Sequence, residues 1–144
     1  MAPDCVSRSP CDGGNSGAAA ATSDHTPFLC VHHNQLFIAW TSSGDQRLNV
    51  AIVPGAGGDF TSRWSGDETS HAGPSLASQG GVLYLGWTGA DDQQLKVLRS
   101  LDNGRTFRDK HSYPEQSAQG PWLCAHNSRL YIAWTRDGKN HVAR

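Results

Sequence analysis

The segment PFLCVHHNQLFIAWT, residues 27–41, recurs as PSLASQGGVLYLGWT at residues 74–88 and as PWLCAHNSRLYIAWT at residues 121–135. Each copy begins 47 residues after the previous one, and no gap is needed to align the three. Five of the fifteen positions are identical in all copies, and the first and third copies share nine. Agreement of this extent indicates internal duplication, and a period of this length is typical of repeat architectures.

Each repeat is expected to form four short strands. In the second repeat, strands are predicted at residues 75–78, 83–87, 95–100 and 107–111, with a turn at Gln79-Gly80-Gly81. The equivalent turns are His32-His33-Asn34 and His126-Asn127-Ser128, and their residue types suit tight turns. The second strand is apolar on both faces, which predicts burial on both sides. Small residues at one position of that strand predict close packing against a neighbouring sheet; they are Ala39, Gly86 and Ala133.

Four short strands in each repeat predict an all-β protein built from β-propeller blades of four antiparallel strands. A solenoid is the alternative, although strand repeats in solenoids are usually shorter. The predicted division is a flexible leader rich in Gly, Ala and Ser at residues 1–26, blades at 27–73 and 74–120, and an incomplete blade at 121–144.

The 118 residues after the leader supply about 2.5 repeats of 47 residues. Closed propellers typically need about four to eight blades, so a partial propeller is expected. Three interpretations stay open: a fragment of a longer protein, self-association that completes a propeller, and a partial array of low stability. The fragment is favoured, because the sequence stops inside the third expected strand of its last repeat.

The second repeat also contains SLDNGRTF at residues 100–107, called the Asp-box segment below. It matches the pattern Ser-x-Asp-x-Gly-x-Thr-Phe at every specified position, namely Ser100, Asp102, Gly104, Thr106 and Phe107. A carboxylate placed there can accept hydrogen bonds from the turn's own backbone, so Asp102 is predicted to stabilise a turn. The equivalent segment of the first repeat keeps only Gly57 and Phe60.

With this motif inside the repeat, residues 24–144 resemble the Asp-box (BNR-repeat) β-propellers, a family best known from sialidases. The resemblance implies a propeller fold and, for a sialidase, an arginine cluster, a tyrosine nucleophile and an acidic partner. The family's Arg-Ile-Pro-like motif is missing from this sequence. Tyr84 and Tyr131 are expected in the core, and Tyr113 and Glu115 in a solvated turn around Pro114. The sequence therefore assigns no catalytic residue.

Net charge and cysteine usage narrow the possible classes of protein further. Twelve Lys plus Arg against thirteen Asp plus Glu give a net charge of −1, which argues against nucleic acid or an anionic membrane surface as partner. No segment is apolar enough for a transmembrane helix, no cofactor motif is present, and no zinc-ligand spacing occurs. The leader cysteines Cys5 and Cys11 allow a local disulfide, whereas Cys30 and Cys124 are expected to be reduced. The compartment stays open.

Ligand-binding candidates come from the repeat positions themselves. His32 and His126 occupy the same position of their repeats, and Trp122 stands where the other repeats have Phe28 and Ser75. Trp40, Trp87 and Trp134 end an apolar strand and are expected to pack between blades. The expected function is a carbohydrate- or ligand-binding module, with glycans as partners. A fragment of a sialidase-like glycoside hydrolase and a protein-interaction scaffold are the alternatives.

Overall fold

The computed structural model describes residues 21–55 and 59–144. Most of the predicted leader, both of its cysteines and Gly57 of the first repeat lie outside the described residues. Within the described residues every regular element is a strand, which confirms the predicted all-β class.

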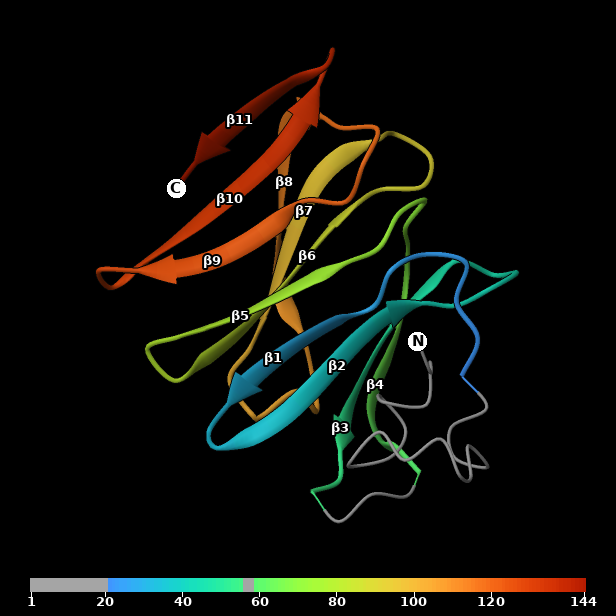
Figure 1. The fold of residues 1–144 in the computed structure, drawn as a ribbon, viewed down its shortest axis with the longest axis vertical. Helices are drawn as coiled ribbons and strands as arrows, with labels where there is room; N and C mark the ends of the chain where they lie inside the picture. Colours follow the sequence, from blue (N-terminus) through green and yellow to red (C-terminus); the bar gives the residue numbers. More distant parts are fainter. Residues whose placement is uncertain (1–20, 56–58) are drawn as a thin grey trace.

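The strands form three antiparallel sheets, each following the order of the chain (Figure 1). The first sheet contains β1 (Phe28–His32), β2 (Gln35–Thr41), β3 (Arg47–Val53) and β4 (Thr61–Thr69). The second contains β5 (Ser75–Gln79), β6 (Val82–Thr88), β7 (Gln94–Ser100) and β8 (Arg108–Gln116). The third contains β9 (Trp122–His126), β10 (Arg129–Arg136) and β11 (Lys139–Ala143).

Two-residue turns join the first two strands of every sheet. Both turn residues have positive φ in all three cases, as in the type I′ turn that matches strand twist. The pairs are His33-Asn34, Gly80-Gly81 and Asn127-Ser128. The predicted turns are therefore confirmed, and they fix the register of the hairpins that open each sheet.

The three sheets stack face to face, with β1, β5 and β9 side by side along one region of the molecule (Figure 1). Phe37 and Val50 of the first sheet pack with Leu85 and Trp87 of the second, and the Trp87 side chain is fully buried. A separate apolar cluster joins the second sheet to the third. Most of the free energy of burial is therefore located between sheets.

The predicted close packing at the small-residue position is confirmed in the first two sheets, whereas Ala133 of the third sheet is only partly buried. A Cβ atom added to Gly86 would stand 3.0 Å from the side chain of Leu123, and Ala39 is fully buried. The backbone itself approaches between sheets at two other glycines. A Cβ on Gly73 would overlap the carbonyl oxygen of Thr26, and one on Gly120 would overlap the carbonyl oxygen of Gly73. The glycines allow successive sheets to approach this closely.

Equivalent hydrogen bonds, made at the same position of the repeat, link each sheet to the next. Thr41 Oγ1 donates to the carbonyl of Ala72 at 2.9 Å, and Thr88 Oγ1 donates to that of Gln119 at 2.8 Å. Both donors are buried, where an unmade hydrogen bond is costly. The identical Thr at the end of each copy thus has a specific role wherever another sheet follows.

The last strand of each four-stranded sheet is longer than predicted. β4 and β8 have nine residues each and continue beyond the strands expected at residues 107–111 and at the equivalent residues 60–64 of the first repeat. Tyr113, Pro114 and Glu115 consequently lie within β8, so the predicted solvated turn at this point is wrong. β8 is an edge strand, where proline is tolerated because one row of backbone groups faces outward.

Candidate functional site

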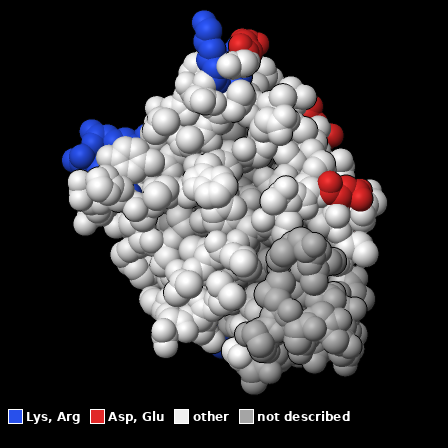
Figure 2. Space-filling view, viewed as in Figure 1, with Lys and Arg blue, Asp and Glu red and all other residues white. Residues whose placement is uncertain are grey.

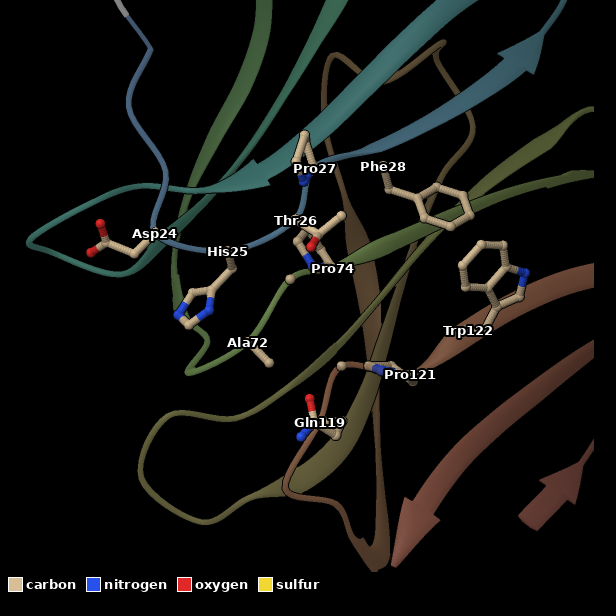
Figure 3. Close-up of a pocket in the computed structure, with 12 residues that line it drawn as sticks. Asp24, His25, Thr26, Pro27, Phe28, Ala72, Pro74, Gln119, Pro121 and Trp122 are labelled. Atoms are coloured by element: carbon tan, nitrogen blue, oxygen red, sulfur yellow. The ribbon is translucent and has the colours of Figure 1, made fainter. Parts of the chain in front are cut away.

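A cavity of about 400 Å³ opens where the three sheets begin (Figure 3). Its walls come from the segment that leads into the first strand of each sheet, called the lead-in segments below. They are residues 24–28, 72–74 and 119–122. These segments are equivalent in the repeat, so the cavity is built from one structural position used three times. Its volume is at the small end of ligand pockets, which span about 300–1,000 Å³.

Two aromatic rings form one wall. The rings of Phe28 and Trp122 meet edge to face, with centroids 4.8 Å apart and planes at 75°. Trp122 is 62% exposed, so much of its indole surface is open to a ligand. Ser75, the equivalent residue of the middle sheet, is small and buried, so the larger rings of the outer sheets can meet. Figure 3 shows both rings on the same side of the cavity.

Polar side chains provide the remaining surface. Asp24 and His25 lie together across from the aromatic pair, and Gln119 comes from the lead-in segment of the third sheet (Figure 3). Ser43 Oγ donates a hydrogen bond of 2.7 Å to Asp24 Oδ1, which orients that carboxylate. An aromatic wall facing a few polar groups is the arrangement that binds and orients small organic ligands.

The cavity has little positive charge. Among the described residues that line it, none is Lys or Arg, and Asp24 is the one carboxylate. On the face of the molecule drawn in Figure 2, charged side chains lie toward the margins and the middle is uncharged. An anionic ligand would therefore find no fixed cationic partner among these residues.

The three sequence-predicted ligand residues are not brought together. Trp122 lines the cavity at the start of β9, whereas His126 is exposed at the opposite end of the same strand. His32 is only 1% exposed, and a 2.7 Å hydrogen bond joins its Nδ1 and Ser78 Oγ of the second sheet. A ligand cannot reach this ring, so its role is to join the first two sheets.

His33 extends this connection to the Asp-box segment. Its ring stacks on that of His32 with centroids 4.0 Å apart, and its Nδ1 lies 2.7 Å from Asn103 Oδ1. Burial and the neighbouring His33 lower the pKa of His32, although the Asn103 amide acts in the opposite direction. Burial and the stacked His33 ring therefore favour a neutral His32.

The Asp-box segment forms a hydrogen-bonded turn between β7 and β8. Asp102 accepts from the backbone N–H of Thr106 at 2.9 Å and from its hydroxyl at 2.7 Å. Ser100 Oγ donates to Asp102 at 2.9 Å and accepts from the N–H of Gly104 at 2.8 Å. The two Thr106 bonds, with a smaller contribution from Ser100, lower the pKa of Asp102 to about 2. Phe107 packs against the core and contacts Trp64, so the turn is anchored at both ends.

Among the described residues, Tyr113 and three of the arginines do not form the arrangement that a sialidase would need. Burial and the nearby Glu115 raise the pKa of Tyr113, whereas an activated nucleophile needs a lower one. Arg47, Arg99 and Arg129 belong to three different sheets, in β3, β7 and β10 respectively. Arg99 forms a 2.7 Å ion pair with Asp109 on the adjacent strand. These residues offer no bidentate clamp for a substrate carboxylate.

The described part of the chain offers few other reactive or metal-binding groups. Cys30 and Cys124 are free thiols, and burial raises the pKa of Cys30. No group of three or more His, Cys, Asp or Glu in residues 21–55 and 59–144 is placed to hold a metal ion. Among those residues no helix is long and apolar enough to cross a membrane.

No protein-family model matches the chain, and no curated protein matches it either. The cavity must therefore be interpreted from its own residues. Trp122 is predicted from the variability of its repeat position, whereas Asp24, Phe28 and Gln119 are not predicted. Their common signal is that they flank the proline that begins each repeat, and repeat symmetry brings these prolines to one place.

Proposed function

We propose that the three sheets are consecutive blades of a β-propeller and that the chain is a carbohydrate-binding module. The proposed site is the cavity between the lead-in segments. In this proposal the sheets supply a rigid support, and the ligand contacts three repeats at once.

The observation that carries the proposal is the aromatic wall facing polar side chains. A pyranose ring has an apolar C–H face that can stack on an exposed indole such as that of Trp122. Its hydroxyl groups can both donate and accept, which suits the Asp24 carboxylate and the Gln119 amide. The match between the Asp-box segment and the Asp-box propellers supports the same proposal.

A glycan array tests the proposal. The wild-type chain is expected to bind a limited group of glycans, and Trp122→Ala is expected to weaken binding about tenfold or more, because the stacking surface is lost. His126→Ala is the matched control, since it alters an exposed aromatic residue of the same strand outside the cavity. Its binding should equal that of the wild type.

Two outcomes would overturn the proposal. Absence of binding across the array would favour a protein-interaction scaffold, and binding unaffected by Trp122→Ala would place any glycan site elsewhere. A sialidase-like hydrolase is less well supported, because Tyr113 lies within an edge strand with a raised pKa. A fluorogenic sialoside assay of the wild type and Tyr113→Phe tests it directly: turnover lost in the variant would establish that function instead.

A further inference from the structure

We infer that the cavity selects neutral sugars and rejects carboxylated ones, sialic acids included. This inference rests on the proposed carbohydrate-binding function and adds the chemical class of the ligand. It differs from what the resemblance to sialidases implies, because in those enzymes arginines hold the substrate carboxylate.

The charge of the lining residues disfavours the binding of a carboxylate. A carboxylate is held best by a guanidinium, which offers two parallel N–H donors. Among the described lining residues there is neither Arg nor Lys. His25 is the one lining residue that could become cationic, and it lies beside Asp24, whose charge has the wrong sign. A carboxylated sugar would lose water from its anionic group without gaining a fixed cation, which is costly.

The cavity instead offers an apolar ring surface and hydrogen-bonding side chains. Trp122 and Phe28 favour an uncharged apolar face, whereas Asp24 and Gln119 favour hydroxyl or amide groups. The backbone carbonyls of Ala72 and Gln119 already accept hydrogen bonds from Thr41 and Thr88. Ligand hydroxyls would therefore bond mainly to side chains at one end of the cavity, and the ring would stack at the other.

The test compares neutral sugars with carboxylated ones, and two pairs, glucose with glucuronide and galactose with galacturonide, differ only in the carboxylate at C6. Calorimetric titrations would compare methyl glycosides of glucose, galactose and N-acetylglucosamine with methyl glucuronide, methyl galacturonide and methyl sialoside. We expect the best neutral glycoside to bind at least about tenfold more tightly than any acidic one. Equal or tighter binding of an acidic sugar would overturn this inference and leave the proposed function standing. Absence of binding by every sugar would overturn both.

Variants at Asp24 test whether the charge of the cavity, rather than its shape, sets the selectivity. Asp24→Asn keeps an oxygen that can accept the Ser43 hydrogen bond but removes the negative charge, and Asp24→Lys reverses the charge. Affinity for methyl glucuronide should rise in the order wild type, Asn, Lys, by up to about fivefold overall, as expected for an exposed ion pair. The affinity for neutral sugars should change less. Acidic sugars binding all three proteins equally would show that charge does not set the selectivity.

Discussion

At the scale of single residues, the Asp102 carboxylate accepts three hydrogen bonds within one turn. Two bonds come from Thr106 and one from Ser100, and together they close the turn between β7 and β8. Both partner residues lie within four residues of Asp102 in the chain. The turn can therefore form locally and hold the last strand of the second sheet in register.

Replacing Asp102 with Asn should lower the melting temperature by a few degrees near neutral pH, because the charge-assisted bonds weaken. The pKa of Asp102 is about 2, below its ordinary value of 3.8. Its charged form therefore stabilises the fold fully above about pH 4, and this contribution is lost as pH falls toward 2. Thermal melts should show the gap between wild type and variant closing over that range. Asp91→Asn, at an exposed turn position, is the control, and a pH-independent gap would contradict the prediction.

His32 also predicts a pH dependence of stability, but here the charged form of the side chain is the one that the fold disfavours. Burial lowers its pKa below the ordinary 6.5, so the unfolded chain binds a proton more readily than the folded one. Stability should therefore fall as pH drops below about 6.5. His32→Gln introduces the residue found at this position in the second repeat, Gln79, and should flatten that part of the stability profile measured by urea unfolding. His126→Gln, exposed at the same position of the third repeat, should keep the wild-type profile, and the same flattening in both variants would contradict the assignment to His32.

These two residues also show what the sequence can predict at this scale. The hydrogen bonds of Asp102 follow from a local motif, so the sequence alone predicts its role as a turn stabiliser. The burial of His32 depends on Ser78 and Asn103, which lie 46 and 71 residues further along the chain. No local pattern reveals such contacts, so the sequence predicts a ligand residue where the structure has a buried histidine.

At the scale of elements, the backbones of successive sheets approach each other closely at Gly73 and Gly120. Each glycine faces a backbone carbonyl of the preceding lead-in segment, and backbone atoms cannot rotate away as a flexible side chain can. The two glycines therefore set the spacing of the sheets at the cavity. Any added atom there must push two sheets apart.

Gly120→Ala should accordingly destabilise the protein by about 1–3 kcal/mol, as overpacking of a close contact usually does. Gly55→Ala is the matched control, because a Cβ atom added there meets nothing within 4 Å. Denaturant unfolding of the two variants measures the difference. Equal stabilities would show that the sheets can separate at the cavity without cost.

The strands differ in how well the sequence predicts them. The hairpins that open each sheet follow from their turn residues, because these contacts are local. The apolar patterns of β2, β3, β6 and β7 predict these four strands, because they are largely buried. The sequence predicts β4 and β8 too short, since their polar residues and Pro114 resemble a loop. An edge strand needs few apolar residues and tolerates proline, so sequence pattern alone does not define where it ends.

At the scale of the whole molecule, burial depends on a residue's place in the stack. Leu48, Leu95 and Val142 occupy one position of the three repeats, but Leu95 is 1% exposed and Val142 is 67% exposed. The second sheet is covered on both faces, whereas the first and third each have one neighbour among the described residues. The repeat predicts which residues face a neighbouring sheet. Which of those faces are covered depends on the number of sheets, and a single repeat does not contain that information.

Amide hydrogen exchange should reveal this difference. Backbone amides of β6 are expected to exchange most slowly, and those of β10 about tenfold or more faster, since the third sheet can open while the other two stay packed. The amides of β2 should fall between them. Uniform protection across the three strands would contradict this order and would indicate that the sheets unfold as a single unit.

The glycine-proline steps at 73–74 and 120–121 have a consequence for how the gene can change. At each step the glycine packs against a backbone carbonyl of the preceding lead-in segment. The proline that follows begins a repeat 47 residues after the start of the previous repeat. Unequal crossing-over between the two steps would delete or duplicate one whole sheet, and every junction would still join a glycine to a carbonyl. Chain length can thus change in units of one sheet without a new packing solution, and protein engineers can add sheets at the same two points.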